Sequence, residues 1–364
     1  MTSGPGVHQF VPTFEPGAVG SHMLQVRRVV REMGLPSTIF AEHRRWPGRT
    51  DAEEYRRYGR AVPAQPGDVL LYQTAIGSTV ADFVLARPET LAVNYHNITP
   101  VRYFADWEPG VVHGVAWGRA QLAAMGERAA LGIAVSRYNE RELSGLGYRR
   151  TTVVPVLVDL DAFDVEVDPG AEERLASPAS TWLFVGRVAP NKAHHDLIKA
   201  FAAYRRAYDP DAVLRIVGAP SSADYSQALR SFVEALGLTD AVVFAGPVSE
   251  ALLAAHYRAA DVFVCVSDHE GFCVPLLEAM HHRLPVVAYA SSAVPETLGD
   301  AGLLLEGKAA TTVAAAVHRV LVDGDLRAGL VAAGGRRLAD FSLARTGERM
   351  AEALGGLLAG TGSE

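Results

Sequence analysis

Two glutamates, Glu270 and Glu278, stand where a strand pattern becomes a helix pattern. The preceding run, Asp261–Cys265, is apolar and β-branched, which is typical of a buried parallel strand. After Pro275 the apolar residues follow helical spacing, and proline is favoured in the first turn of a helix. The pattern therefore places Glu270 on the turn and Glu278 about two helical turns further on.

This junction has the residue types that recognise a nucleotide sugar. The start of a helix offers free backbone N–H groups and a positive dipole end, which together suit a phosphate. The carboxylates of Glu270 and Glu278 can accept hydrogen bonds from sugar hydroxyls on either side of that phosphate. Sugar, diphosphate and ribose in that order make up a nucleotide sugar. The alternative is an ordinary capped and salt-bridged helix start that binds no ligand.

A second cluster, Gly186, Arg187 and Lys192, directly follows an apolar run at 181–185. Ligands of parallel α/β sheets bind at the carboxyl ends of strands, which is where these residues are expected. Arginine and lysine there could stabilise a leaving diphosphate without a metal ion. The alternative is a helix-entry loop with two solvated cations.

Two further loops are candidates for the same ligand. Ser291 and Ser292 follow a predicted strand and could reach the phosphates or the sugar, although a capping role competes. Gly17 and Gly20 lie between the first predicted strand and the first helix, where glycine lets the backbone approach a ligand. Their spacing is not a dinucleotide fingerprint, so an ordinary turn is the alternative.

Apolar runs alternate with helical stretches along the whole chain, and this alternation predicts parallel, doubly wound sheets. Helices are expected at 21–33, 78–86, 112–130 and 138–146 in the first half, and at 343–358 at the end. Segment 42–67 is expected to be a long polar loop. Strands are expected at 7–12, 37–41, 68–73, 91–95, 133–136, 152–158, 181–185, 212–217, 241–245, 261–266 and 285–288.

The segment around the two glutamates resembles the signature of the retaining GT-B glycosyltransferases, family 4 (glycosyl transferases group 1) in particular. The residues in register with Glu270 and Glu278 are Gly271, Phe272, Pro275, Ala279 and Met280. The glycine and arginine at 186–187, followed five residues later by a lysine, resemble a second motif of that family. The sequence departs from the family where glycine is usual, with Ala193, Cys273 and Arg283 in those places.

The resemblance implies an α/β protein of GT-B fold, with two Rossmann-like doubly wound parallel-sheet domains facing a cleft. We expect an N-terminal acceptor domain at 1–163 and an acidic, Pro/Ser-containing linker at 164–180. A nucleotide-sugar donor domain is expected at 181–342, followed by a helix at 343–364 that crosses back to the N-terminal domain.

The resemblance also implies roles for individual residues. His96 resembles the family's strand-end histidine, which lies against the donor sugar and the acceptor hydroxyl. Glu270 is expected to orient sugar hydroxyls without acting as a nucleophile, while Arg187 and Lys192 stabilise the leaving diphosphate. The residues expected around the donor are Gly17, Gly20, Gly186, Gly271, Phe272, Cys273, Val274, Glu278, Ser291 and Ser292, with Glu278 on the ribose.

The implied function is transfer of a sugar from a nucleotide-diphosphate sugar to an acceptor hydroxyl, with retention of anomeric configuration. Two alternatives stay open: a GT-B epimerase or hydrolase of nucleotide sugars, and a non-catalytic nucleotide-sugar binding protein. The acceptor could be a small molecule, a glycan or a lipid-linked molecule. The nucleotide base, the sugar, the acceptor and the oligomeric state are not determined by the sequence.

The acceptor is expected against segment 42–67. Arg44, Arg45, Trp46 and Arg56 combine charge with flat surfaces, which suits a phosphorylated, acidic or ring-shaped acceptor. Three arginines of the first helix, at 27, 28 and 31, could instead rest on an anionic membrane surface. A solvated face is the alternative for both groups.

Length and composition exclude several other classes of protein. The length of 364 residues suggests two domains, and a net charge of −7 argues against general nucleic-acid binding. No run reaches the roughly 18 apolar residues of a membrane-spanning helix, and the polar N-terminus lacks a signal-peptide core. With only Cys265 and Cys273, a disulfide framework is not expected, and a reducing cytoplasm fits.

No metal or other cofactor is expected. Adjacent histidines at 194–195 and 281–282 point in different directions on a helix, so neither pair presents two ligands on one face. The Asp-x-Asp pairs at 159–161 and 323–325 are expected to be caps and turns rather than a metal clamp.

Overall fold

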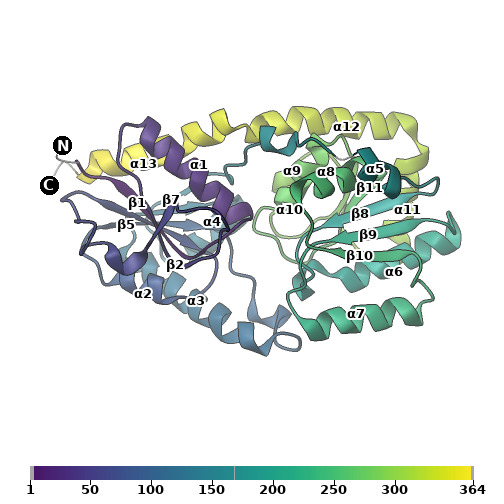
Figure 1. The fold of residues 1–364 in the computed structure, drawn as a ribbon, viewed down its shortest axis with the longest axis horizontal. Helices are drawn as coiled ribbons and strands as arrows, with labels where there is room; N and C mark the ends of the chain where they lie inside the picture. The colour runs from purple at the N-terminus through teal and green to yellow at the C-terminus, as the bar shows by residue number, and fades with distance from the viewer. Residues whose placement is uncertain (1–3, 168, 362–364) are drawn as a thin grey trace. The chain divides into compact units, whose positions relative to one another are not determined.

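A computed structural model describes residues 4–167 and 169–361 of the chain (Figure 1). It divides into two compact units. Unit 1 takes in the chain up to Val101, Gly110–Asp159 and the chain from Phe341 onward. Unit 2 consists of Arg102–Pro109 and Leu160–Asp340.

Unit 1 is built on a seven-stranded parallel sheet in the order β3-β2-β1-β4-β5-β6-β7. Its strands are β1 (Val7–Phe14), β2 (Ile39–Arg44), β3 (Ala52–Glu54), β4 (Val69–Thr74), β5 (Thr90–Tyr95), β6 (Leu131–Ala134) and β7 (Thr151–Val153). Its helices are α1 (Ala18–Glu32), α2 (Thr79–Leu85), α3 (Pro109–Arg128), α4 (Arg137–Gly145) and α13 (Leu343–Thr361), with a 3₁₀ turn η1 at Tyr55–Arg57.

Unit 2 has a six-stranded parallel sheet in the order β10-β9-β8-β11-β12-β13, the Rossmann order 3-2-1-4-5-6. Its strands are β8 (Thr181–Val185), β9 (Val213–Val217), β10 (Val242–Gly246), β11 (Val262–Cys265), β12 (Val286–Tyr289) and β13 (Leu303–Leu305). Its helices are α5 (Pro169–Leu175), α6 (His194–Ala207), α7 (Ala223–Ala235), α8 (Glu250–Arg258), α9 (Val274–His281), α10 (Val294–Leu298), α11 (Ala310–Val322) and α12 (Gly324–Leu338), and a 3₁₀ turn η4 (Pro190–Lys192) precedes α6.

Helices cover both faces of each sheet, which explains why the strands are continuous apolar runs (Figure 1). In unit 2, Trp182 of β8 is fully buried and packs edge-to-face on Phe201 of α6 at 5.5 Å between ring centroids. In unit 1, Met350 and Leu354 of α13 are fully buried in the same cluster as Val26 and Val30 of α1. The C-terminal helix is thus part of the core of unit 1.

The expected fold class, two parallel α/β sheets, is confirmed, but several elements differ from the sequence expectation. β3 and η1 lie inside segment 42–67, which had the polarity of a loop. Its order comes from two tyrosines: Tyr55 and Tyr58 are 2% and 1% exposed. The hydroxyl of Tyr58 donates to Asp68 at 2.8 Å. Short β13 was not expected either, because three leucines carry no periodicity.

The segment 164–180, which was expected to be a linker, contains α5. Val167 and Ala171 are buried against Ala254 and Ala255 of α8. Acidic residues gave this segment the composition of a linker, whereas its few apolar residues pack into unit 2.

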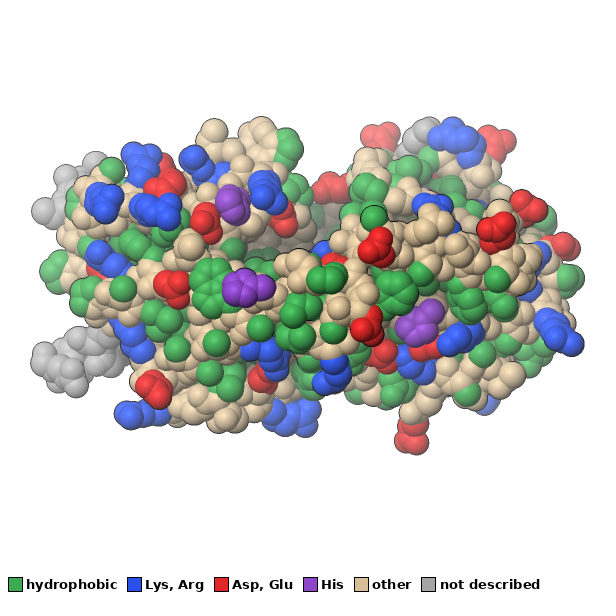
Figure 2. Space-filling model, turned by 90° about the horizontal axis from the view of Figure 1, so that it is seen from below, with side chains coloured by type: hydrophobic (Ala, Val, Ile, Leu, Met, Phe, Trp, Pro, Cys, Tyr) green, Lys and Arg blue, Asp and Glu red, His purple; other side chains and the backbone are tan. Residues whose placement is uncertain are grey.

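Lysine and arginine side chains are interspersed with aspartate and glutamate on the face drawn in Figure 2. Within residues 4–167 and 169–361, no helix combines the length and the apolar character that crossing a membrane requires.

The three positions where the family usually has glycine all have a left-handed backbone. φ is 51° at Ala193, 74° at Cys273 and 57° at Arg283. Arg283 closes α9, because its N–H donates to Met280 O at 3.0 Å and the N–H of Leu284 donates to Ala279 O at 2.9 Å. These two bonds form a Schellman motif with arginine in the place that glycine favours. A side chain in this conformation costs about 1–2 kcal/mol.

We therefore predict that Arg283→Gly stabilises the protein. Relief of the left-handed strain outweighs the extra freedom of the unfolded chain, for a net gain of about 0.5–1 kcal/mol. Chemical denaturation measures the free energy of unfolding. Arg319→Gly, at an exposed residue inside α11, is the matched control and should instead destabilise by about 1 kcal/mol. Equal destabilisation in both variants would contradict the strain at Arg283.

Candidate functional site

The loops after β8 and β11 lie next to each other because these two strands pair in the sheet. The pair is also the point where the strand order reverses, since β9 and β10 lie on one side and β12 and β13 on the other. Ligands of open α/β sheets bind outside the carboxyl ends of strands at such a point. The two motifs that the sequence singled out, residues 186–192 and 270–278, meet here.

An ion pair joins the two loops. Lys192 Nζ lies 2.6 Å from Glu270 Oε2, and these side chains are only 20% and 8% exposed. Burial is the largest single effect and lowers the pKa of Lys192, but the Glu270 carboxylate together with the two nearby cysteines raises that pKa overall. The backbone adds two bonds, from Asn191 Nδ2 to His269 O at 3.0 Å and from Asp268 N to Asn191 O at 2.9 Å. The site is therefore braced before any ligand enters.

The loop after β12 supports the turn at Glu270. The N–H of Glu270 donates to Ser292 Oγ at 2.7 Å, and Ser291 Oγ donates to Ser267 O at 2.5 Å. The hydroxyl of Thr297 donates to Phe272 O at 2.6 Å. Both expected serines therefore lie at the turn, where their hydroxyls bond to its backbone.

Helix α9 begins without a side-chain cap. Its N-cap residue is Cys273, whose left-handed backbone turns the chain into the helix. In the described part of the chain, the N–H groups of Gly271, Cys273 and Val274 donate no hydrogen bond. Free N–H groups at a left-handed turn before a helix make a concave site for an anion.

Glu278 lies within α9 and is held by a residue that the sequence analysis missed. Tyr257 of α8 donates from its hydroxyl to Glu278 Oε2 at 2.6 Å. Burial raises the pKa of Glu278, while the bond from Tyr257 acts in the opposite direction. No local motif pointed to this tyrosine, which lies in a different helix.

Gly186 and Arg187 begin the loop after β8. Gly186 has φ 148° and donates from its N–H to Val217 O at 2.9 Å. The side chain of Arg187 is exposed and makes no hydrogen bond or ion pair among residues 4–167 and 169–361. Arg187 is therefore available to an anion in this loop.

In unit 1, Gly17 and Gly20 lie at the start of α1. Gly17 is the N-cap, with φ 131°, and is exposed. A Cβ on Gly20 would lie 2.1 Å from Glu15 O and 2.8 Å from the ring of Trp46. Close packing of the helix on its own loop thus accounts for Gly20 without a ligand.

His96 follows β5 and ends a buried polar network in unit 1. Its Nε2 lies 2.7 Å from Gln73 Oε1, which also accepts from Asn94 Nδ2 at 2.9 Å. The amide of Asn94 lies 2.6 Å from His22 Nε2, and Gln73 donates to Gln9 Oε1 at 2.8 Å. Because Gln73 Oε1 only accepts, His96 must carry its proton on Nε2. Burial lowers the pKa of His96 to about 4.

The arginines expected to contact the acceptor fall into two groups. Arg44 and Arg45, at the end of β2, are exposed and form no ion pair in the part of the chain that the structure describes. Arg56 pairs with Glu54 at 3.3 Å and lies over the ring of Tyr55 at 4.4 Å. Trp46 packs on Phe14 at 5.1 Å between ring centroids. The arginines at 27, 28 and 31 bond to Asp51, Glu32 and Ser37 O respectively.

One group of possible metal ligands is present among the described residues. It was not among the histidine and Asp-x-Asp pairs considered from the sequence. The ligand atoms of Cys265, Glu270 and Cys273 all lie within 4.8 Å of one another. The adjacent histidines are not part of such a group: His194 is buried beside Phe184, and His281 bonds to Asp164 at 2.8 Å.

A cavity of about 790 Å³ lies elsewhere in unit 2, between the end of α9 and α12. Its lining includes Met280, Arg283, Arg327 and Leu338. None of the residues expected to hold the donor lines it, so the geometry of the β8 and β11 loops, rather than cavity volume, identifies the candidate site.

Residues 171–337 match the family model described as Glycosyl transferases group 1. The chain is 39% identical over 240 residues to a D-inositol 3-phosphate glycosyltransferase of Geodermatophilus obscurus, covering 63% of this chain and 52% of that protein. It is 31% identical over 243 residues to a GDP-mannose-dependent alpha-(1-6)-phosphatidylinositol monomannoside mannosyltransferase of Mycobacterium tuberculosis, covering 61% and 62%. The chain thus spans between about half and three fifths of the length of these relatives.

Solved structures share the fold over nearly the whole chain. Sucrose-phosphate synthase from Thermosynechococcus elongatus superposes with a TM-score of 0.76 at 21% identity, covering 98% of this chain and 100% of that one. HepE of Anabaena in complex with UDP-glucose gives 0.73 at 17% identity, covering 96% and 99%. The chain therefore has the fold of these GT-B proteins, and its residues 171–337 are similar to the glycosyl transferases group 1.

The partly buried position of His96 gives a prediction that does not depend on a ligand. The imidazole should titrate near pH 4, below the ordinary value of 6.5, because burial disfavours the imidazolium. NMR of protein labelled in its histidine rings measures this, and His96→Gln assigns the resonance by its loss. A transition near pH 6.5 for that resonance would mean that solvent reaches the ring freely.

Proposed function

We propose that this protein transfers a sugar from a nucleotide-diphosphate sugar to an acceptor hydroxyl with retention of anomeric configuration. The observation that carries the proposal is the largely buried pair of Lys192 and Glu270, 2.6 Å apart, at the point where the strand order of unit 2 reverses. A cation, a carboxylate and free backbone N–H groups converge there, and these are the groups that a sugar diphosphate requires.

A different protein group binds each part of the donor. Glu278, fixed by Tyr257, holds the ribose hydroxyls. The N–H groups at the start of α9 hold the diphosphate. Glu270 holds hydroxyls of the sugar. Phe272 lies on the same turn, and Gly186 begins the neighbouring loop after β8. Lys192 has three N–H donors, so it can keep its bond to Glu270 and still contact a departing phosphate oxygen.

The pairing of Glu270 supports its role as an orienting group rather than a nucleophile. A carboxylate that is already bonded to Lys192 is a weakened nucleophile, because its charge is shared with the ammonium group. We propose front-face displacement, in which the acceptor oxygen attacks from the side of the leaving diphosphate. The leaving phosphate oxygen takes the acceptor proton, and the anomeric configuration is kept.

For the acceptor we propose unit 1, and Arg44 and Arg45 in particular. Both are exposed, and their side chains form no ion pair within residues 4–167 and 169–361, so they can bind a phosphate or carboxylate. Two curated relatives are named for inositol phosphate and phosphatidylinositol acceptors. Inositol phosphates are therefore the first acceptors to test. His96, held neutral, can bond to a hydroxyl of the sugar or the acceptor. We also propose a cytoplasmic location, where both cysteines stay reduced.

A donor screen tests the function as a whole. Thermal shift with a panel of UDP- and GDP-sugars identifies the donor, because a ligand that binds only the folded state raises the melting temperature. Product analysis with and without acceptor then distinguishes transfer from hydrolysis or epimerisation. Donor turnover that is independent of any acceptor would overturn the transfer proposal, and binding without turnover would leave a binding protein.

The two glutamates should have separable effects. Glu278→Ala should weaken binding of the free nucleoside diphosphate by roughly tenfold to a hundredfold, the worth of hydrogen bonds to a charged group. Glu270→Ala should leave that binding nearly intact and abolish transfer. Isothermal titration calorimetry and product assays measure the two quantities, with exposed Glu250→Ala as control. Equal loss of nucleotide affinity in both variants would overturn the division of roles.

Catalysis should need no divalent metal, since Lys192 and Arg187 can meet the charge on the leaving diphosphate. We expect full activity in excess EDTA. Lys192→Ala or Arg187→Ala should lower the rate about thirtyfold to a thousandfold, corresponding to about 2–4 kcal/mol. Lys199→Ala, at an exposed lysine of α6, should have no effect. Activity that vanishes with EDTA and returns with magnesium or manganese would assign the cationic role to a metal.

A further inference from the structure

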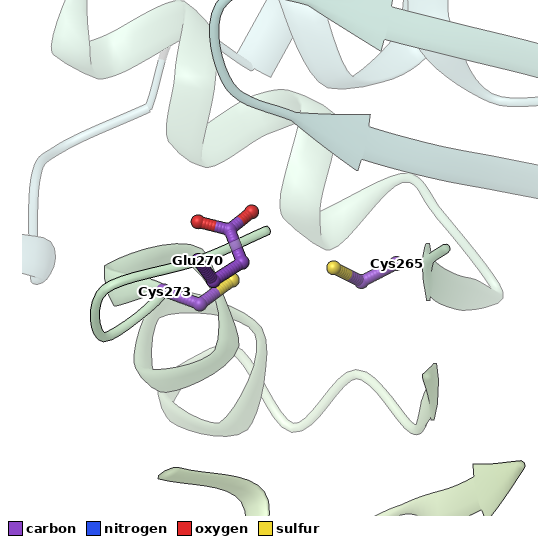
Figure 3. A group of neighbouring side chains, drawn as sticks. All are labelled: Cys265, Glu270 and Cys273. Atoms are coloured by element: carbon purple, nitrogen blue, oxygen red, sulfur yellow. The ribbon is translucent and has the colours of Figure 1, made fainter. Parts of the chain in front are cut away.

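The chain has two cysteines, and the fold brings both to the turn at Glu270 (Figure 3). Cys265 ends β11, and Cys273 precedes α9 after a turn of seven residues. Both sulfur atoms and a carboxylate oxygen of Glu270 lie within 4.8 Å of one another. Exposure is 1% at Cys265, 8% at Cys273 and 7% at Glu270, so all three are buried.

The cluster depends on the left-handed conformation at Cys273. With φ 74° and ψ 65°, this residue turns the chain back after Glu270. Figure 3 shows the sulfur of Cys273 beside Glu270 and the sulfur of Cys265 pointing toward both. Two side chains eight residues apart in the sequence are thus brought together with a carboxylate, an arrangement that packing alone does not require.

We propose that Cys265, Glu270 and Cys273 form a binding site for a thiophilic divalent cation of the zinc type. Two thiolates and one carboxylate are ligands that zinc accepts in a tetrahedral site, leaving a fourth position for water. Hard cations such as magnesium and calcium prefer oxygen ligands throughout, so two sulfur atoms select against them. The site is distinct from the metal clamp that other glycosyltransferases use, because it takes up the sugar-binding carboxylate.

Charge balance supports this assignment. Binding replaces two thiol protons with the cation, so two protons leave and two thiolates form. Two thiolates, one carboxylate and a divalent ion leave one net negative charge. Lys192 Nζ, 2.6 Å from Glu270, supplies the matching positive charge. Without the ion, the thiols are neutral and Lys192 balances Glu270 alone. The buried assembly is therefore neutral in both states, which avoids the cost of an unpaired buried charge.

The consequence is inhibition by metal, and this part rests on the proposed function. A carboxylate that coordinates a cation can no longer accept hydrogen bonds from the donor sugar. The ion and the sugar therefore compete for Glu270. A thiophilic metal should inhibit transfer even though transfer itself needs no metal.

Cadmium is the probe, because thiolate–cadmium bonds absorb in the ultraviolet and the chain has no other cysteines. The experiment uses the full chain, kept reduced with a phosphine rather than a dithiol that would compete for the ion. We expect one cadmium per chain, with charge-transfer absorption and release of two protons, measured with an indicator dye in weak buffer. Magnesium should give neither signal.

Cys265→Ser and Cys273→Gly each remove one thiolate and should weaken cadmium binding at least about tenfold, with loss of the absorption. Cys273→Gly also relieves the left-handed strain, so a folding defect would not explain its loss of binding. Ser226→Ala, at a hydroxyl of α7 that bonds to none of the three ligand residues, is the control and should bind as the unaltered protein does. Absorption that is absent from the unaltered protein, or unchanged in Cys265→Ser, would overturn the site.

Zinc or cadmium should inhibit sugar transfer by the unaltered protein at concentrations that saturate the absorption. Cys265→Ser should keep its basal activity and lose at least about tenfold in sensitivity to the metal. Saturated binding without inhibition would overturn the competition for Glu270. If no donor is ever turned over, the absorption and proton release still decide the metal site, so failure of the proposed function is separate from failure of this inference.

Discussion

The ion pair between Lys192 and Glu270 is the contact on which the site in unit 2 depends. It crosses from the loop after β8 to the loop after β11, and both side chains are largely withdrawn from water. A buried pair contributes little net stability, because desolvation of both charges offsets their attraction, whereas loss of one partner leaves an unpaired charge that costs about 3–5 kcal/mol. Such a pair is better explained by the geometry that it enforces. Both loops are held in one arrangement before a charged ligand arrives, so less ordering is needed on binding.

Backbone strain lies close to this pair. Ala193 follows Lys192 directly, and Cys273 ends the turn that begins at Glu270; both have left-handed conformations that glycine would adopt more easily. Strained residues persist where surrounding contacts determine the conformation. In the turn that ends at Cys273, Ser292 accepts from the Glu270 N–H and Thr297 donates to Phe272 O. A side chain at position 273, which glycine would lack, places a second sulfur beside Glu270 and so makes metal chemistry available there.

The sequence predicted those parts of the structure that depend on local pattern. Short-range patterns in the sequence were sufficient to predict the apolar strands and the order of strands and helices. They also identified the two motifs around Lys192 and Glu270. Features that depend on contacts between distant segments could not. Tyr257 reaches Glu278 from another helix, and its position has no periodicity that would distinguish it from a core tyrosine. β3 is ordered by Tyr58 and Asp68, two residues within a stretch whose polarity suggested a loop. The roles of His96 and of the acceptor arginines stay predictions.

Two of the expected catalytic residues are withdrawn from water, yet their pKa values shift in opposite directions. The difference follows from the partner of each side chain. Lys192 faces a carboxylate, so its pKa is raised and the ammonium form persists. His96 faces the amide oxygen of Gln73, which stabilises no positive charge as a carboxylate would, so burial lowers its pKa to about 4. Between pH 5 and pH 8 the first group thus stays charged and the second stays neutral. The proposed roles need those fixed states: a cation meets the leaving diphosphate, and a neutral imidazole accepts from a hydroxyl through its free Nδ1. In unit 2, Glu270 keeps Lys192 protonated. In unit 1, Gln73 offers His96 no such charge, so the imidazole stays neutral.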